Sequence, residues 1–217
     1  MWRFGDTVWT MCLLASALIL AGSCVEAGSD PGRVHQFEEQ TVTISDFAAD
    51  GWVLDVGGGG EGIIGRLKGA QVVAVDISER ELREAPDGPL KIVMDARELR
   101  FLDGTFQTAT CFFTLMYIDG SDHEKVFREV HRVLAPGGRF LVWDVVLPAE
   151  HDEGKEIAVF PLRIRLPNKE VETGYGTHWP ERDQNLAHYV RIAEAAGFEV
   201  KQSHEQERRL YLELVKP

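Results

Sequence analysis

The chain has few cysteines, and their spacing does not suggest a bound metal or a disulfide framework. Its 217 residues contain 3 cysteines, at Cys12, Cys24 and Cys111. None of them forms the closely spaced pair that is typical of a zinc site. Cys111 stands alone in an apolar segment, so we interpret it as a small buried hydrophobic residue. These absences argue against a fold held together by metal ions or disulfides.

Positive charge is also scarce. The chain has 23 lysines and arginines against 35 acidic residues, and its formal net charge is −12. Basic residues form short pairs such as Arg208-Arg209 but no stripe. Such a surface repels polyanions, so we expect no nucleic acid among the partners. No internal repeat or low-complexity tract stands out, and a chain of this length with 44% hydrophobic residues can bury the core of one full domain.

The most informative feature that is present is an acid directly in front of a run of glycines. Asp55 precedes four consecutive glycines at the point where a buried strand should turn into a helix. Glycines in this place permit a tight bend and let a ligand approach the backbone. Gly57, Gly59 and Gly62 satisfy the G-x-G-x-x-G spacing of dinucleotide-binding loops, and Asp76 lies near the position of the ribose-binding acid. The glycines alone therefore leave open a nicotinamide-nucleotide-dependent oxidoreductase.

The acid favours a cationic ligand over a pyrophosphate. A carboxylate at the strand tip would repel phosphate groups bound at the N-terminus of the following helix. S-adenosyl-L-methionine carries a sulfonium and an ammonium group and no phosphate, so Asp55 would attract its amino-acid end. A second acid, Asp76, could bind the ribose hydroxyls. The alternative is that Asp55 only caps the turn or the helix.

Together with the segments that follow, this loop resembles that of class I S-adenosylmethionine-dependent methyltransferases of the small-molecule type. The resemblance runs from about Val34 to the C-terminus. Residues 55–59 match the acid-x-Gly-x-Gly loop of that family, but Glu61 stands where a third glycine is usual. The resemblance implies S-adenosyl-L-methionine as the cofactor. It also implies an α/β fold with a doubly wound, Rossmann-like, mostly parallel sheet and an antiparallel C-terminal edge strand.

The resemblance assigns cofactor contacts to the ends of the next expected strands. Asp76 would hold both ribose hydroxyls, and Ile77 would lie against the adenine. Asp95 would accept a hydrogen bond from the adenine amino group, with Ala96 donating its backbone N–H to the ring, and the carbonyl at Phe112 would receive the methionine ammonium. A helix cap at Asp76, an ordinary loop acid at Asp95 and core packing of the Phe112 ring are the alternatives. The expected cofactor-binding set is Asp55, Gly57, Gly59, Asp76, Ile77, Asp95, Ala96 and Phe112.

The second half of the chain has the elements that complete this fold. Apolar spacing predicts a helix over residues 122–134, which a Pro-Gly-Gly turn ends before a buried strand over residues 139–146. A polar, loop-like stretch follows, and then a helix over residues 181–196. The runs at 197–200 and 209–215 can form the reversed hairpin that separates these methyltransferases from dehydrogenases.

Candidate catalytic residues are Tyr117, Asp119 and His178. We expect the pocket of a small-molecule methyl acceptor over the end of the fourth strand, with Tyr117 and Asp119 closest to the methyl group. Residues 175–180 would form a lid in which His178 could act as a base. Ordinary surface or core roles are the alternatives for each residue. A non-catalytic S-adenosylmethionine-binding protein is a further alternative to a methyltransferase.

The first 30 residues do not fit the rest of the chain. No charged residue lies between Asp6 and Glu26, and residues 8–21 are mostly apolar. This pattern resembles a secretory signal or a membrane anchor, so membrane contact is expected only through residues 8–25. A buried helix and a start site placed too early are the alternatives. Because export would remove the enzyme from its cytosolic donor, we favour a cytoplasmic catalytic domain over residues 34–217, with export or anchoring as the second hypothesis.

Overall fold

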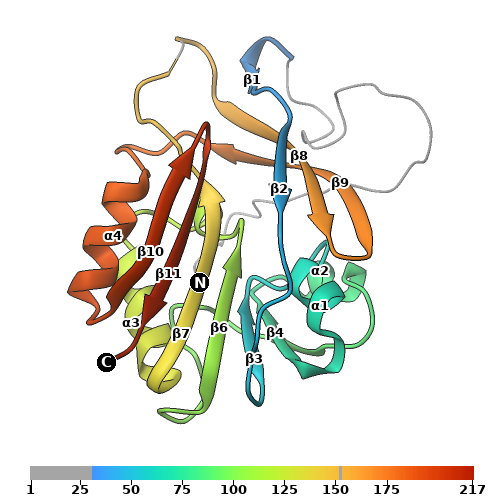
Figure 1. The fold of residues 1–217 in the computed structure, drawn as a ribbon. Coiled ribbons are helices and arrows are strands. Elements are labelled where there is room, and N and C mark those ends of the chain that lie inside the picture. Colours follow the sequence, from blue (N-terminus) through green and yellow to red (C-terminus); the bar gives the residue numbers. More distant parts are fainter. Residues whose placement is uncertain (1–30, 152) are drawn as a thin grey trace, which may run out of the picture. The chain divides into compact units, whose positions relative to one another are not determined.

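The computed structural model describes residues 31–151 and 153–217, which divide into two compact units. The small β unit comprises residues 31–44 and His151–Trp179. The α/β unit comprises Ser45–Glu150 and Pro180–Pro217. Each unit therefore combines segments that are far apart in the sequence, as the colours of Figure 1 show.

The α/β unit is built on a seven-stranded sheet with the order β10-β11-β7-β6-β3-β4-β5 (Figure 1). The five strands from β7 to β5 pair in parallel, whereas β11 is antiparallel to both β7 and β10. This confirms the expected mostly parallel α/β sheet with antiparallel pairing at its C-terminal edge. The strands are β3 (Val53–Val56), β4 (Val72–Asp76), β5 (Leu90–Val93), β6 (Phe106–Phe112), β7 (Leu134–Val145), β10 (Glu199–Gln206) and β11 (Arg209–Val215).

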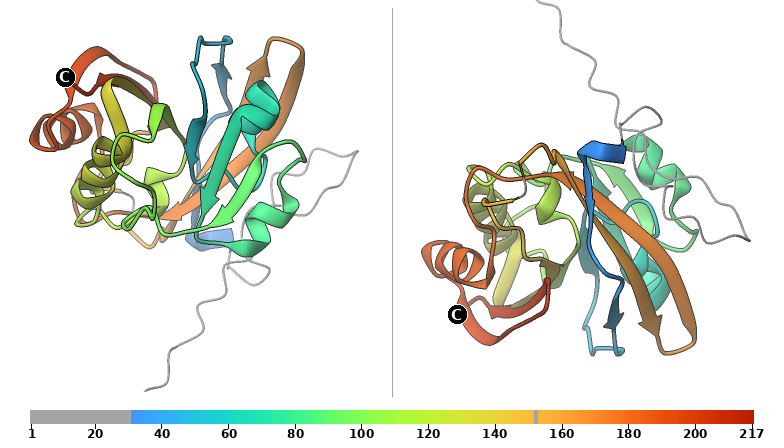
Figure 2. Two further views of the ribbon diagram at one scale, coloured as in Figure 1. Left: turned by 90° about the horizontal axis from the view of Figure 1, so that it is seen from below. Right: turned by 90° about the horizontal axis from the view of Figure 1, so that it is seen from above.

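Helices cover both faces of this sheet, which explains why its central strands are mostly buried and rich in apolar residues. All four residues of β3 are buried. Helices α1 (Ile63–Lys68) and α2 (Glu79–Glu84) contact β4, whereas α3 (His123–Val133) packs on β7 and on α4 (Leu186–Ala195), which covers β10 and β11. Figure 2 shows the two pairs of helices on opposite sides of the sheet.

The starts of helices α2 and α4 follow from side chains that cap the backbone. Helix α2 starts after Ser78, whose hydroxyl oxygen accepts a hydrogen bond from the backbone N–H of Glu81 at 3.2 Å. The helix expected over residues 181–196 begins later, at Leu186. The reason is that Gln184 pairs with Leu147 as a β-bridge, and Asn185 then caps α4 by accepting from the N–H of His188.

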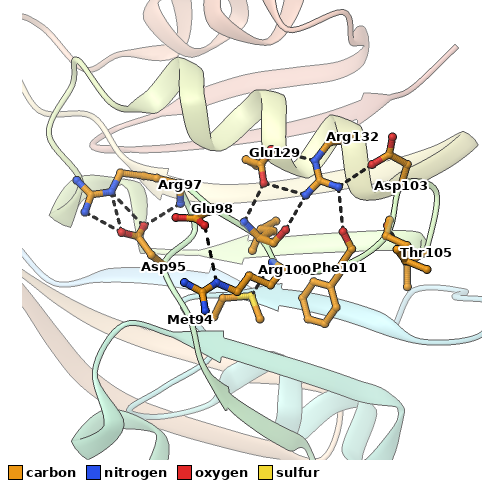
Figure 3. Close-up of polar contacts among 12 residues, drawn as sticks. Met94, Asp95, Arg97, Glu98, Arg100, Phe101, Asp103, Thr105, Glu129 and Arg132 are labelled. Carbon is orange, nitrogen blue, oxygen red and sulfur yellow. Dashed lines mark hydrogen bonds and ion pairs between the residues drawn. The ribbon is translucent and has the colours of Figure 1, made fainter.

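The connection between β5 and β6, residues 94–105, contains neither helix nor strand and is held by side chains of α3 (Figure 3). Arg132 donates to the carbonyl oxygens of Leu99 and Phe101 at 2.6 and 2.9 Å, and to Asp103 at 2.7 Å. Glu129 accepts from the backbone N–H of Leu99 at 2.8 Å. These bonds satisfy backbone groups that a helix would otherwise pair internally.

The small β unit contains a four-stranded sheet. Strand β8 (Ile157–Leu166) pairs in parallel with β1 (Val34–Gln36) and β2 (Gln40–Thr43), and antiparallel with β9 (Lys169–His178). The expectation of a loop-like stretch was therefore wrong, because much of it forms the β8–β9 hairpin.

Pro161 explains why this strand is hard to recognise from the sequence. Proline cannot donate to a ladder and argues against a central strand. In β8 it lies between the residues that pair with β1, which end at Val159, and those that pair with β2, which begin at Leu162. The backbone N–H that Pro161 lacks thus falls at the gap between the two short partner strands, β1 and β2.

The expectation of a membrane anchor is corrected. The apolar segment on which it depended lies in residues 1–30, outside the described residues. Across residues 31–151 and 153–217, no helix has the length and apolar character needed to span a bilayer. We therefore withdraw the prediction of localisation that was based on that segment.

Candidate functional site

The glycine loop after β3 passes directly over two carboxylates. The backbone N–H groups of Gly57 and Gly58 both donate to the carbonyl oxygen of Val75, at 2.8 and 3.1 Å, which ties the loop to β4. A Cβ atom added to Gly58 would lie 2.7 Å from Oδ2 of Asp55. One added to Gly59 would lie 2.8 Å from Oδ2 of Asp76. Glycine is required because the backbone runs against these acids with no room for a side chain.

Asp55 is a buried carboxyl group without a positively charged partner. Its side chain is at the end of β3, the residue is 2% exposed, and Oδ1 accepts from the hydroxyl of Thr110 at 2.7 Å. Burial raises its pKa to about 7, the Thr110 hydrogen bond acts against this, and the charge of Asp76 adds to it. No lysine or arginine in the described part of the chain pairs with Asp55. A ligand cation beside this group would favour its ionised form.

Asp76 ends β4, and both of its oxygens accept from backbone groups. Oδ1 accepts from the N–H of Ser78 at 2.8 Å and Oδ2 from that of Gly59 at 3.3 Å. Burial raises its pKa, and these bonds act against the shift. The residue that caps α2 is Ser78, through its hydroxyl, and not Asp76. Asp76 holds the turn that precedes this helix. The next residue, Ile77, is 67% exposed and offers an apolar surface beside this carboxylate.

Asp95 follows β5 and is held by an arginine that the sequence analysis did not identify (Figure 3). Arg97 donates to Asp95 through its backbone N–H and through Nε and Nη2, at 2.7 to 3.0 Å, and Nη1 donates to Asp122 at 2.7 Å. These bonds lower the pKa of Asp95. Asp95 thus stays ionised beside Arg97. Ala96 lies between them, half-buried against the core.

The end of β6 is joined to the glycine loop by one threonine. The hydroxyl of Thr114 lies 3.2 Å from the carbonyl oxygen of Phe112 and 3.3 Å from that of Val56. A Cβ atom on Gly57 would overlap the Thr114 side chain. Phe113, which lies between Phe112 and Thr114 in the chain, has φ = 49°, a backbone conformation that is uncommon for a bulky residue. The two strand ends that border the predicted methionine position are therefore held together.

A second buried acid, Asp144 on β7, supports the same region. Oδ2 accepts from the backbone N–H groups of Thr114 and Leu115 at 3.1 and 2.8 Å, and Oδ1 accepts from that of Val145 at 2.8 Å. Burial raises its pKa to about 7 against these hydrogen bonds. The signal for this residue in the sequence is an acid within a largely apolar run.

The three candidate catalytic residues do not all lie in one unit. Tyr117 ends the short 3-10 helix η3 (Leu115–Tyr117) of the α/β unit and is half-buried. Asp119 is exposed nearby in sequence, accepts from the backbone and hydroxyl of Ser121 at 2.8 and 2.6 Å, and has a lowered pKa because of these bonds. His178 is the exposed last residue of β9 in the small β unit. Residues 175–178 of the expected lid belong to strand β9 and pair with β8.

The strand order and the glycine loop over two acids define a class of protein. An antiparallel β11 between β7 and β10, after five parallel strands, is the arrangement that distinguishes class I S-adenosylmethionine-dependent methyltransferases from dehydrogenases. The fold, together with the sequence matches described next, supports a class I S-adenosylmethionine-dependent methyltransferase with S-adenosylmethionine as its cofactor.

Comparisons with known proteins agree with this assignment. Residues 54–142 match the family described as a methyltransferase domain. A ubiquinone/menaquinone biosynthesis C-methyltransferase from Pseudomonas putida is 33% identical over 162 residues, which cover 65% of this chain and 62% of that protein. The chain spans about half the length of the curated relatives it matches.

Solved structures share the fold. The PH0226 protein of Pyrococcus horikoshii has a TM-score of 0.55 and 24% identity, covering 77% of this chain and 82% of that one. Phosphoethanolamine N-methyltransferase 2 of Haemonchus contortus, in complex with S-adenosyl-L-methionine, has a TM-score of 0.58 and 17% identity. That match covers 79% of this chain and 50% of the other.

Proposed function

We propose that this protein transfers a methyl group from S-adenosyl-L-methionine to a small-molecule acceptor. The observation that carries the proposal is the pair of carboxylates, Asp55 and Asp76, directly beneath the glycine loop. Two acidic side chains at this place, of which Asp55 ionises more readily beside a cation, oppose a pyrophosphate and favour a cationic ligand without phosphate. A nicotinamide-dependent oxidoreductase is disfavoured for the same reason.

The residues present suit the parts of this cofactor. Asp76 would receive the ribose hydroxyls, since each of its oxygens has a lone pair beyond the backbone bond it already accepts. Ile77 would cover the adenine, and Asp95 and Ala96 would meet the edge of its ring. Asp55 would face the cationic amino-acid end, close to the Phe112 carbonyl. When bound, the cofactor supplies a methyl group already activated on a sulfonium.

The protein's main task is then to align the acceptor with that methyl group. Tyr117 follows the end of β6 and would form part of the acceptor site. Asp119 stays ionised and could take up a proton from an acceptor that must lose one. The net charge of −12 and relatives named as C-methyltransferases of ubiquinone and menaquinone biosynthesis or of sterols support a small acceptor over a polyanion.

Binding of S-adenosylhomocysteine tests the cofactor site. We expect Asp76→Ala to abolish the heat of binding in calorimetry, because the ribose hydroxyls lose their acceptor. Asp87→Ala removes an exposed acid of the same unit and should bind like the unmodified protein. Binding of a nicotinamide dinucleotide in place of S-adenosylhomocysteine would contradict the proposal. Incubation with isotopically labelled donor and cell extract, followed by mass spectrometry, would then identify the methylated product.

A further inference from the structure

The short turn after β6 is held on both sides by buried ionisable side chains. This post-β6 turn, residues 113–118, contains η3 and lies at the carboxyl end of a parallel strand, where ligands of such sheets bind. On one side Asp144 accepts from the N–H groups of Thr114 and Leu115. On the other side lies His123, the first residue of α3, which is fully buried.

The hydrogen bonds of His123 define its tautomer. Its Nε2 lies 3.0 Å from the carbonyl oxygen of Leu115 and 3.0 Å from that of Ile118. Carbonyls only accept, so Nε2 carries a proton. Its Nδ1 lies 3.0 Å from Nε2 of His188 on α4, and in the neutral ring Nδ1 must accept from that partner. Both imidazoles are therefore neutral. His188 donates to His123, and His123 donates to the two carbonyls of the turn.

The surroundings keep both rings neutral. Burial lowers the pKa of His123, while the two carbonyls and the nearby Asp119 and Asp122 act in the opposite direction. Burial, His123 and Arg191 lower the pKa of His188 to about 4. A buried donor is costly to leave unpaired, so the turn's carbonyls and this ring stabilise each other.

We propose that His123 is a positioning residue, which with His188 and Asp144 holds the post-β6 turn in the geometry that binds the methyl donor and presents Tyr117. Asp144 holds the N–H groups of the turn and His123 holds its carbonyls. Thr114, within the turn, joins it to Val56 at the start of the glycine loop. The inference rests on the proposed function for its catalytic consequence, but the clamp itself is a property of the fold.

The test compares three histidine variants of the full chain. His123→Leu removes the donor, and His123→Gln restores an N–H near the position of Nε2. His131→Leu is the matched control, because His131 lies on the same helix and packs on Phe198 away from the turn. We expect faster amide hydrogen exchange in residues 112–119 and about tenfold weaker binding of S-adenosylhomocysteine for His123→Leu only, with recovery in His123→Gln.

Unchanged exchange and affinity in His123→Leu would overturn the proposal, as would equal losses in His131→Leu. Failure of the unmodified protein to bind S-adenosylhomocysteine would instead refute the proposed function, while the exchange measurement still tests the clamp. If His123→Leu does not fold, nitrogen NMR of labelled histidines in the unmodified protein decides. A neutral His123 protonated at Nε2 supports the clamp, and a charged ring or one protonated at Nδ1 refutes it.

Discussion

At the scale of single residues, the site depends on buried acids whose charge a ligand can control. Asp55 lies on β3, beside β6 and the glycine loop. Its hydrogen-bond donor in this structure is the neutral hydroxyl of Thr110. Its raised pKa means that the fold favours the neutral carboxyl. The stability from this group is present below its unfolded pKa of 3.8 and is lost as pH rises through about 7. A cationic ligand reverses this preference, so binding and ionisation are linked.

Binding of the demethylated cofactor S-adenosylhomocysteine, which keeps the cationic ammonium group, should therefore strengthen as pH rises toward 7. We expect the affinity for S-adenosylhomocysteine to increase by up to about tenfold per pH unit below the pKa of Asp55 and to level off above it. Calorimetry between about pH 5.5 and about pH 8.5 measures this dependence. In Asp55→Asn the affinity should be low and the slope largely lost. A slope that persists in this variant would show that another group is responsible.

At the scale of elements, side chains of helix α3 hold the backbone of a segment that forms no helix or strand itself. The connection between β5 and β6 carries Asp95 and Arg97, yet it has no regular structure of its own. Arg132 and Glu129 of α3 hold its backbone, and Arg97 ties it to Asp122 at the N-terminus of the same helix. The order of this connection is thus provided by α3.

Loss of Arg132 should destabilise the fold measurably. Arg132→Ala leaves two backbone carbonyls and two acids without their donor, so we expect the free energy of unfolding to fall by about 1–3 kcal/mol in urea denaturation. Arg128→Ala is the control on α3, since Arg128 is 65% exposed and pairs with Glu124 on the helix surface. It should cost well under about 1 kcal/mol. Equal effects of the two variants would rule out this role of Arg132.

The same scale shows where sequence patterns were sufficient and where they were not. Strands β3, β4, β6 and β7 and helix α3 were predicted because continuous apolar runs and helical spacing are local properties. The β8–β9 hairpin was missed because its exposed positions are polar and Pro161 interrupts the pattern. Its pairing partners β1 and β2 lie more than a hundred residues earlier, and no local pattern reveals such a contact.

At the scale of the whole molecule, the excess of acidic residues bears on the partner. With a net charge of −12, long-range electrostatics oppose approach to a phosphate backbone. We expect no change in the fluorescence anisotropy of a labelled single- or double-stranded oligonucleotide, even at about 50 mM salt, where phosphate contacts are strong. Saturable, salt-sensitive binding would contradict the prediction and favour a nucleic-acid acceptor.

By itself the sequence determined the class of fold and the type of cofactor, because both follow from recognisable residue patterns along the chain: an acid, the glycines directly after it and the acid that ends the next strand. Only the tertiary structure decided how these groups are supported. Asp144, His123 and Arg132 act on backbone groups that lie 5 to 33 residues away along the chain. Such bonds exist only after the strands and helices have packed, so no local pattern marks the residues that make them.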